Sequence, residues 1–565
     1  MPLTDDSASH TVKQTRAGYA LLCCIGAALV WALTYLPWLG LLDLLLEEPR
    51  RALIARTMLE TGDYWVPRLG GEIYTAKPPL FNWLIALTAT VTGELDEWSA
   101  RLPAVISVAL LAVVMVWGAR HWLRPWSLAF LAAALILAPE FLVKGRLAEI
   151  ETLFALLVAA SLWSWFLLYR RGAAGVRLWL LPLVLVALAY LAKREPAPVF
   201  FYLAVAPFLL WRGQWRMLLQ RGHFIGIGVA ALLVGGWLVG VALQTGWETL
   251  WNTLQREVLE RGLTAQGWGG IVLHIVLYPL ELLASMLPFS LLLPLLAAPA
   301  VWRGASERFG ELFLFCLIGV VVNLPVYWFR GDVSVRYFLP MFPFVLLMAA
   351  MVFEVLFHEQ EKVGRWGRRY LRAIHWSGLG IGAVLVLALL VSMVLPWVDA
   401  KRSALLPTLL TLGIVLAGAG SLWWLWRSEN LRPMLRLLVL FCAINLVGRA
   451  LYFNLILPDK VQRVAAELNA PLIASQLRNT VGPEDVVLAS GVPWAVWYYS
   501  TSGFLQPLPG ESPPAPGSWL LINERLADQV AALGFPAQES IRYVYKGDVL
   551  LLGRIPLPVT EEPPQ

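Results

Sequence analysis

Charged residues are scarce in this sequence of 565 residues, since only 15% of them are Asp, Glu, Lys or Arg. A soluble globular protein carries roughly 25% charged residues. Hydrophobic residues make up 59% of the chain, and many of them stand in long runs. The scarcity of charge excludes an ordinary soluble protein, and the apolar runs predict an α-helical polytopic membrane protein.

Cysteine and histidine are also rare, with four Cys and six His in the whole chain. The cysteines lie inside apolar runs, where a thiol behaves as a small buried apolar group. No HxH or HxxxH pair occurs, so neither disulfides nor a zinc site of ordinary spacing is expected. The net charge of +6 is typical of a membrane protein that uses Lys and Arg to set its topology, and no nucleic-acid partner is expected.

The chain has no internal repeat and no matching pair of broken helices, which argues against a secondary transporter. With about 20 apolar residues needed to cross a membrane, we count about thirteen candidate spans. These candidates are Tyr19–Leu41, Trp98–Trp117, Arg124–Leu142, Ala148–Leu168, Leu178–Leu191, Pro196–Trp211, Phe224–Leu243, Pro279–Trp302, Leu312–Trp328, Tyr337–Phe357, Ser377–Val398, Leu405–Trp426 and Leu435–Leu457.

Short Arg-rich connections alternate with the other loops along the chain, and they predict a cytoplasmic N-terminus. The stretch 42–97 then faces outward and forms the largest polar interruption of the N-terminal half. From residue 458 onward the composition changes. A helical pattern over Val461–Gln476 and strand patterns over Asp485–Ala489, Trp519–Ile522 and Tyr543–Leu552 predict a small α/β domain over 458–565 outside the membrane.

The outward stretch contains the adjacent acids Glu47 and Glu48, followed by Pro49 and a helical pattern that ends at Gly62. This pattern predicts an amphipathic helix on the membrane surface. Arg68 and Lys77 follow, and a second short helix is predicted over Leu80–Thr90. Two acids at a membrane exit are explained either by simple solvation or by a carboxylate at the edge of a cavity that accepts a proton.

Three further outer segments combine cations with acids close to predicted span ends. The string KGRLAEIE offers two pairings, Arg146 with Glu149 or Lys144 with Glu151. Lys193, Arg194 and Glu195 form a charged turn, and Arg330, Asp332 and Arg336 precede Tyr337. Each set alone is explained equally well by charges exposed to water, or by a local ion pair that lowers the cost of membrane insertion, as by a functional site. Together they predict a pocket for an anionic head group with one or two general bases.

The string EEPRRALIARTMLETGDYWVPRLGGEIYTAKPPLFNWLIA resembles the first outer loop of the lipid-A aminoarabinose transferase (ArnT) type, within the protein O-mannosyltransferase superfamily. The shared features are the acid pair, R-x-x-x-x-A-R-x-M, G-D, a later Pro and K-P-P-L. SARLP, Arg146 with Glu151, Lys193 and RYFLP resemble further motifs of that family.

Departures from the family pattern accompany this resemblance. Glu47 and Glu151 stand where the family usually has Asp, and Ala76 stands where aminoarabinose transferases have a metal-binding Glu. The large outer loop over Thr249–Ile271 lacks the expected His, and the K-G-P turn has become K-R-E-P from Lys193. A different sugar or acceptor is therefore expected, with no certain cofactor; a divalent metal is left open although zinc-type ligands are absent.

The resemblance implies a GT-C fold, with residues 1–457 forming the transmembrane glycosyltransferase domain. It implies inverting transfer of a hexose or pentose from a polyprenyl phosphate to a lipid, glycan or protein at the outer face of a bacterial inner membrane, as in lipopolysaccharide modification. The expected catalytic residues are Glu47, Glu151 and Glu48. The expected donor-phosphate-binding residues are Lys77, Lys193, Arg336, Arg50, Arg68, Arg146 and Tyr337. The alternatives are a lipid or solute transporter or flippase, and a catalytically inactive scaffold of the same fold.

Overall fold

The computed structural model describes residues 6–260, 268–329, 333–359, 363–394, 432–467, 469–482, 485–508, 514–531, 535–536 and 540–556, with isolated residues between 413 and 427. The described chain forms two compact units. Unit 1 comprises residues 1–39, 76–81 and 101–458, and unit 2 comprises residues 40–75, 82–100 and 459–565. The last segment of unit 2 starts at Asp459, and its first two segments come largely from the outward stretch.

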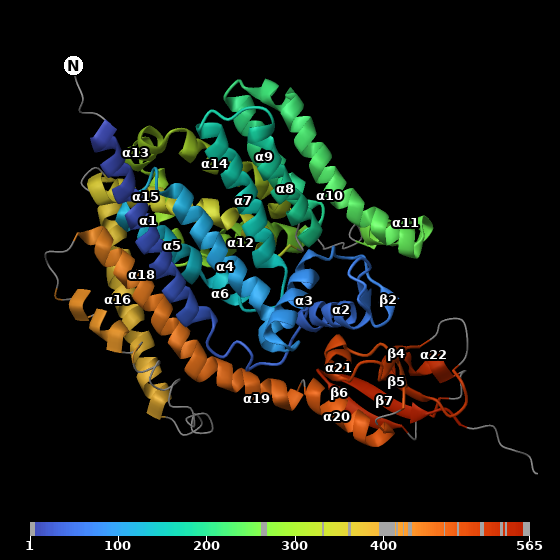
Figure 1. Ribbon diagram of the computed structural model, residues 1–565. Coiled ribbons are helices and arrows are strands. Elements are labelled where there is room, and N and C mark those ends of the chain that lie inside the picture. The colour runs from blue at the N-terminus through green and yellow to red at the C-terminus, as the bar shows by residue number, and fades with distance from the viewer. Residues whose placement is uncertain are drawn as a thin grey trace, which may run out of the picture. The chain divides into compact units, whose positions relative to one another are not determined.

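Unit 1 is a bundle of helices (Figure 1). Its helices are α1 (Asp6–Tyr35), α4 (Glu97–Ala119), α5 (Pro125–Leu137), α6 (Pro139–Lys144), α7 (Glu151–Arg170), α8 (Val176–Lys193), α9 (Pro196–Trp211), η1 (Trp215–Leu219), α10 (Arg221–Thr245), α11 (Trp247–Glu260), α12 (Trp268–Ala284), η2 (Phe289–Ala297), α13 (Pro299–Phe309), α14 (Glu311–Trp328), η3 (Val335–Met341), α15 (Phe342–Glu359), α16 (Gly364–Val394), α18 (Pro433–Leu451) and the π-helical η6 (Tyr452–Ile456). Helix α19 (Leu457–Glu467) starts at the end of unit 1, and its residues from Asp459 onward belong to unit 2.

Among the described residues, nine helices are long and apolar enough to cross a membrane, or ten with the bent pair of η2 and α13. The count of about thirteen spans is therefore not confirmed. The expected span Arg124–Leu142 is divided at Ala138 between α5 and α6, because Pro139 lacks the N–H that would continue the helix. The expected span Leu405–Trp426 lies largely outside the described residues.

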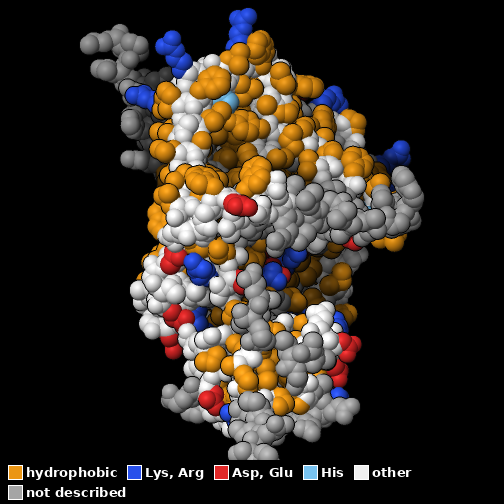
Figure 2. Space-filling view, turned by 90° about the vertical axis from the view of Figure 1, so that its right-hand side faces the viewer, with side chains coloured by type: hydrophobic (Ala, Val, Ile, Leu, Met, Phe, Trp, Pro, Cys, Tyr) orange, Lys and Arg blue, Asp and Glu red, His pale blue; other side chains and the backbone are white. Residues whose placement is uncertain are grey.

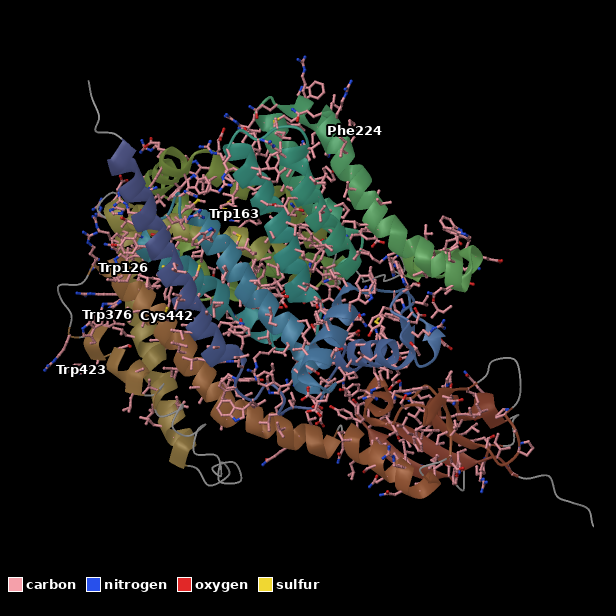
Figure 3. The ribbon with its side chains drawn as sticks, in the orientation of Figure 1. Trp126, Trp163, Phe224, Trp376, Trp423 and Cys442 are labelled. Atoms are coloured by element: carbon pink, nitrogen blue, oxygen red, sulfur yellow. The ribbon has the colours of Figure 1, made fainter. Side chains whose placement is uncertain are left out.

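The core of unit 1 is centred on α15, whose residues from Phe342 to Leu356 are all buried. Large aromatic side chains fill the space around it, and Trp163 on α7 is only 1% exposed. Trp126 and Trp376 instead face outward and are 50% and 63% exposed (Figure 3). Figure 2 shows hydrophobic side chains covering one face of the bundle and Lys and Arg side chains at its rim. Helices with apolar side chains both in the core and on the outer surface are typical of a bundle that faces lipid.

Unit 2 joins two short helices of the outward stretch to a sheet near the C-terminus. Its elements are α2 (Glu48–Thr61), β1 (Arg68–Leu69), β2 (Glu72–Ile73), α3 (Leu80–Thr92), α20 (Ala470–Val481), β3 (Val487–Ser490), α21 (Trp494–Tyr499), β4 (Leu505–Pro507), β5 (Trp519–Asn523), η7 (Glu524–Leu526), α22 (Ala527–Ala531), β6 (Ile541–Tyr545) and β7 (Asp548–Arg554). In the described residues the larger sheet has the order β4-β3-β5-β7-β6.

The strands of this sheet are parallel on one side and antiparallel on the other. β3 pairs in parallel with β4 and β5, whereas β7 runs antiparallel to β5 and β6. The expected single strand Tyr543–Leu552 is therefore two strands. The chain reverses at Lys546 and Gly547, both with positive φ, which is the geometry of a tight hairpin turn.

Helix α2 confirms the predicted helix after Pro49, and it ends at Gly62 with a φ of 71°. Its predicted place on the membrane surface is not what the structure shows. Leu53, Ile54 and Met58 are buried in the same apolar core as residues of α20, α21 and the sheet. The helical spacing of apolar residues identifies a buried face, but it does not distinguish lipid from protein as the partner.

The close packing of α8 against α10 generates a prediction about Gly222. A Cβ added at this position would lie 2.1 Å from the backbone carbon of Gly175, and a backbone cannot give way as a flexible side chain can. We expect Gly222→Ala to destabilise the purified protein by about 1–3 kcal/mol, measured as a lower midpoint of thermal unfolding. Gly228→Ala on the same helix is the control, because nothing lies within 4 Å of its added Cβ. Equal midpoints for the two variants would contradict the packing.

Candidate functional site

The ends of α7 and α8 bring a glutamate and a lysine together in unit 1. α8 ends at Lys193 because Arg194 takes a φ of 68°, and Pro196 then starts α9. A positive φ at a residue with a side chain is strained and persists only where the surroundings enforce it. The Nζ of Lys193 lies 3.2 Å from the Oε1 of Glu151, the first residue of α7. Both side chains are largely buried, so each stabilises the charge of the other.

A second ion pair lies in the segment that leads into α7. The Nζ of Lys144 is 2.8 Å from the Oε2 of Glu149, whose side chain is 3% exposed. The two pairings considered from the sequence, Arg146 with Glu149 and Lys144 with Glu151, are therefore wrong. Lys144 pairs with Glu149, because Lys193 from α8, far away in the sequence, is the partner of Glu151.

These groups form one ionic cluster, which we define as Glu140, Lys144, Glu149, Glu151, Lys193 and Arg336. Burial raises the pKa of Glu149, and the negative charge of Glu151 raises it further. Burial likewise raises the pKa of Glu140, with Lys144 opposing the shift. Three carboxylates and three cations thus share one region, and their formal charges cancel. Such perturbed acids beside cations are typical of functional sites.

Aromatic rings cover the cationic side of the cluster. The Nζ of Lys193 lies 4.7 Å from the ring centroid of Tyr337 and 5.6 Å from that of Phe154. The guanidinium of Arg336 lies 5.3 Å from the Tyr337 ring. The Nε of Arg336 is buried and has no hydrogen-bond partner among the described residues. Two cations held by one ring, one with an unused donor, are suited to binding an anion.

Four of the predicted site residues are therefore brought together in the ionic cluster and beside it, namely Glu151, Lys193, Arg336 and Tyr337. Arg330 and Asp332, which the sequence grouped with Arg336, lie outside the described residues. Arg146 belongs to a different neighbourhood. It donates to the carbonyl oxygen of Tyr35 and lies 5.1 Å from the ring of Phe453.

The surroundings of Arg146 are cationic. Burial lowers its pKa to about 9, and Arg449 and Arg101 lower it as well. Arg449 and Arg101 donate to the carbonyl oxygens of Thr34 and Leu39. The three guanidiniums thus satisfy carbonyl groups at and just beyond the end of α1, where cations are favourable. A donor-phosphate role for Arg146 stays a prediction.

The two acids of the outward stretch lie in unit 2 and have different environments. The Oε2 of Glu48 accepts from the backbone N–H of Leu45 at 3.0 Å, and Glu48 is fully buried. This contact favours a structural role. Glu47 instead pairs with Arg50 at 2.9 Å, and its side chain is 42% exposed. Of the two carboxylates, that of Glu47 is the one open to an acceptor.

The other predicted cations also have defined neighbours. The Nε of Arg68 lies 4.0 Å from the Oδ2 of Asp63 in unit 2. Lys77 belongs to unit 1 and is partly buried. Since Glu47 and Glu151 belong to different units, their action on one substrate stays a prediction from the sequence. So does the catalytic role assigned to each of them.

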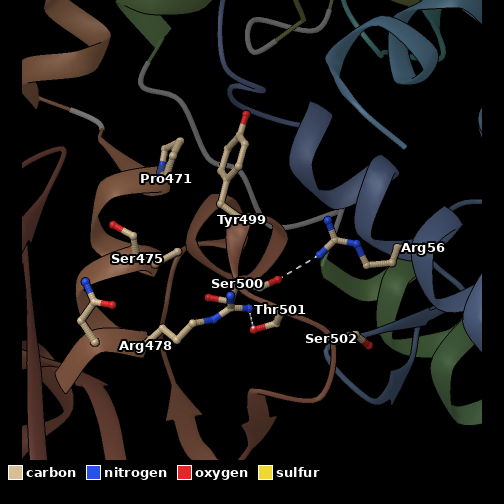
Figure 4. A pocket seen from close by; sticks show the side chains of 10 residues that line it. Arg56, Pro471, Ser475, Arg478, Tyr499, Ser500, Thr501 and Ser502 are labelled. Carbon is tan, nitrogen blue, oxygen red and sulfur yellow. Dashed lines mark hydrogen bonds between the residues drawn. The ribbon is translucent and has the colours of Figure 1, made fainter. Parts of the chain in front are cut away.

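Unit 2 contains a polar cavity of about 500 Å³ beside α2 and α20 (Figure 4). Arg56 donates to the carbonyl oxygen of Ser500 at 3.1 Å, and Arg478 donates to the hydroxyl of Thr501. The other described lining residues are Pro471, Ala474, Ser475, Asn479, Tyr499 and Ser502. Two guanidiniums among hydroxyl and amide groups are suited to a polar, anionic ligand.

The metal site of the resembling family does not fit these residues. Ala76 offers no ligand atom at the position of the metal-binding acid. The described residues contain no group of three or more His, Cys, Asp or Glu that could hold a metal ion. His274 lies 4.8 Å from Tyr278, ring to ring, and its Nε2 is buried without a hydrogen-bond partner among the described residues.

A bundle of apolar helices with a buried ionic cluster, together with a small α/β unit, agrees with the GT-C fold that the sequence resemblance implies. A family model described as dolichyl-phosphate-mannose-protein mannosyltransferase matches residues 76–239. The chain has the same fold as ArnT from Cupriavidus metallidurans. The structure bound to undecaprenyl phosphate has 18% identity and a TM-score of 0.67, and the match covers 97% of this chain and 99% of that one.

Curated relatives extend this similarity to sequence. An undecaprenyl phosphate-alpha-4-amino-4-deoxy-L-arabinose arabinosyl transferase from Pseudomonas paraeruginosa is 28% identical over 54% of both chains. The protein of the same name from Edwardsiella ictaluri is 27% identical over 81% of this chain and 82% of its own. The chain thus spans about half the length of the Pseudomonas relative. The resemblance to the ArnT type is confirmed, and the chain is ArnT-like with the GT-C fold.

Sequence reasoning missed Glu140 as a member of the site. From the sequence, this residue falls only within the expected span Arg124–Leu142. The sequence did contain a signal, because Glu140 follows Ala138-Pro139 directly and stands in an apolar segment. An acid in such a segment needs a partner, which indicates a buried ionic contact. Its partners, however, come from residues that only the fold brings near.

The Lys193–Glu151 pair generates a prediction about stability. We expect Lys193→Met to destabilise the protein by about 3 kcal/mol, because the carboxylate of Glu151 would remain buried without its main partner. The double variant with Glu151→Gln should lose less than the sum of the single variants, with a coupling of about 1–3 kcal/mol. Equilibrium unfolding of the purified proteins measures both.

The exposed pair of Arg463 and Asp459, with side chains 68% and 47% exposed, is the matched control. The same cycle with Arg463→Met and Asp459→Asn should give a coupling of at most about 0.5 kcal/mol. Additive effects at Lys193 and Glu151 would show that the buried pair does not couple.

Proposed function

We propose that this chain transfers a sugar from a polyprenyl phosphate to a lipid acceptor at the extracytoplasmic face of a bacterial inner membrane. The observation that carries this proposal is the buried ionic cluster, in which Lys193 and Arg336 share the ring of Tyr337. The names of the relatives support the same donor class, since they refer to undecaprenyl phosphate. The fold and the multi-pass character are shared with ArnT.

The donor requires cations near its phosphate. When the bond between the anomeric carbon and the phosphate oxygen breaks, its electron pair stays with the phosphate, and negative charge grows there. Lys193 has three N–H donors, and its recorded contact to Glu151 uses one of them. Arg336 offers its buried Nε. We assign the phosphate to these two residues, with Lys77 as a third cation.

The acceptor requires a base. Its hydroxyl attacks the anomeric carbon from the side opposite the phosphate, which inverts the configuration, and its proton passes to a carboxylate. We assign this role to Glu47, whose carboxylate is partly exposed and held by Arg50. Glu151 is the second candidate, because Lys193 keeps its carboxylate in place. The polar cavity of unit 2, with Arg56 and Arg478, supports a role for this unit in acceptor choice.

The proposed orientation of the chain in the membrane follows from the distribution of Lys and Arg along it. Arg120, Arg171, Arg212 and Arg308 belong to connections that the sequence predicts to be cytoplasmic. The opposite ends of the spans then face outward together with Lys144 and Lys193. We therefore propose a cytoplasmic N-terminus and an extracytoplasmic unit 2.

Replacing the proposed base tests the reaction. Glu47→Gln should reduce the transfer rate by at least about 100-fold, since the amide cannot accept the proton, while expression and thermal unfolding remain unchanged. Transfer is measured with purified protein, a polyprenyl-phosphate sugar and extracted envelope lipid. Mass spectrometry of envelope lipids from cells with and without the protein identifies the sugar and the acceptor.

Two further variants make this result decisive. Glu47→Asp keeps a carboxylate and should retain much more activity, whereas Glu72→Gln alters an exposed acid of the same unit and should change nothing. Turnover like that of the unaltered protein in Glu47→Gln would remove Glu47 from the role. Movement of unmodified lipid across the membrane without sugar transfer would favour the transporter alternative.

Lys77 generates a separate prediction on donor use. Lys77→Ala should raise the KM for the donor about tenfold, because one charge-assisted contact to the phosphate is lost, with little change in acceptor KM. Lys460→Ala, on the exposed surface of α19, is the control of equal charge change. Unchanged donor kinetics in Lys77→Ala would exclude Lys77 from the phosphate contact.

A further inference from the structure

A cationic cavity lies at the end of the bundle where α1 begins. It has a volume of about 340 Å³, and its described lining includes four arginines, Arg16, Arg120, Arg124 and Arg308, and no acid. Arg16 lies on α1 and Arg308 on α13, whereas Arg120 and Arg124 belong to the connection between α4 and α5. We call this cavity the arginine pocket. The fold thus brings together charges from three separate parts of the sequence.

Among the described residues, the arginine pocket carries an excess of positive charge. Arg124 and Arg308 both contact Glu354, whose side chain is only 1% exposed. Arg16 and Arg120 instead donate to backbone carbonyls, of His121 and Trp117, which neutralise no charge. Burial lowers the pKa of His121, and the positive charges of Arg120, Arg171 and Arg16 lower it further. Protonation there is therefore disfavoured, as expected in a positive potential.

An apolar groove continues from the arginine pocket along the bundle. It has a volume of about 470 Å³ and shares Tyr19 and Pro125 with the pocket. Its other lining residues come from α1, α5 and α18, which lie side by side (Figure 1). Trp126 and Cys442, labelled in Figure 3, are among them.

Small residues keep this groove open. Gly26, Ala27, Ala129 and Ala133 are part of the lining. A Cβ added at Gly26 would meet no atom within 4 Å, so the space beside this residue is empty rather than filled by a neighbour. A cavity lined in this way accepts a flexible hydrocarbon chain.

We propose that the arginine pocket and the apolar groove together bind one anionic phospholipid, with its phosphate among the arginines and an acyl chain in the groove. A soluble anion has no hydrocarbon chain to fill the groove. A zwitterionic lipid carries no net negative charge and would neutralise the arginines less well. Basic pockets between membrane helices bind anionic head groups in this way. The occupied leaflet is the one that the beginning of α1 faces.

This lipid site is separate from the proposed transfer site. Tyr19 lines the arginine pocket, whereas Tyr35, at the other end of α1, accepts a hydrogen bond from the loop that carries Lys144 and Glu149. Sixteen helical residues separate these tyrosines by about 24 Å at 1.5 Å per residue. The phospholipid is therefore a bound component of the bundle and not the sugar donor, and the inference does not depend on the proposed function.

Native mass spectrometry of the full-length protein tests the site. The protein is titrated with phosphatidylglycerol and, separately, with phosphatidylcholine of the same acyl chains. We expect one tightly held phosphatidylglycerol and much weaker phosphatidylcholine binding. The double variant Arg16→Gln, Arg120→Gln should raise the dissociation constant for phosphatidylglycerol about thirtyfold. These two arginines are chosen because Arg124 and Arg308 also support the buried Glu354.

The groove is tested independently by Gly26→Phe, which fills the empty space without changing charge. It should weaken phosphatidylglycerol binding about tenfold or more, because the ring displaces part of the acyl chain. The controls are Arg216→Gln with Arg303→Gln, which remove two charges outside the pocket, and Gly228→Phe, at an open position on α10.

Three outcomes would overturn the proposal. Equal binding of the two lipids would leave the arginines without a role. Equal effects of the Arg16/Arg120 and Arg216/Arg303 variants would place the lipid elsewhere. Retention of a polyprenyl phosphate at this site in preference to phosphatidylglycerol would make the occupant a donor lipid instead. Thermal unfolding of each variant verifies that it is folded.

Discussion

The ion pair between Lys193 and Glu151 is the contact on which the candidate site depends. It joins the last residue of α8 to the first residue of α7. A charge at the edge of a bilayer is costly unless it has a partner, and each member of the pair supplies that partner. The positive φ of Arg194 ends α8 directly after Lys193, the residue that forms the pair.

The sequence predicted the elements of the fold better than their partners. Apolar runs and turn residues identified most of the long helices, α2 with its end at Gly62, and the C-terminal strands, because these features depend on local patterns. The burial of α2 against α20 and the sheet was not predictable, since an amphipathic face carries no information on whether lipid or protein covers it. The hairpin at Lys546 and Gly547 was merged into one strand for a similar reason: its apolar residues continue on both sides of the turn.

The candidate site shows the same limit at the level of single residues. The sequence selected Glu151, Lys193, Arg336 and Tyr337 individually, and the fold brings them together. Its proposed pairings failed because ion pairs depend on distances across the fold, which sequence spacing does not give. Arg146 illustrates the point. It is adjacent to the cluster in sequence, yet it contacts the end of α1, where carbonyl groups rather than carboxylates need a cation.

The ionic cluster and the arginine pocket of unit 1 differ in their balance of charge. In both, burial makes an uncompensated charge costly. In the ionic cluster, three carboxylates offset three cations, so the buried charges of this region are balanced within the protein. In the part of the arginine pocket that the structure describes, Glu354 contacts two of the four arginines, and the other two donate to neutral backbone carbonyls. Uncompensated charge beside an apolar groove costs stability unless an anion with a hydrocarbon chain is present. A membrane supplies such a molecule in large excess, so an arrangement that would be unfavourable in water becomes favourable in an anionic bilayer.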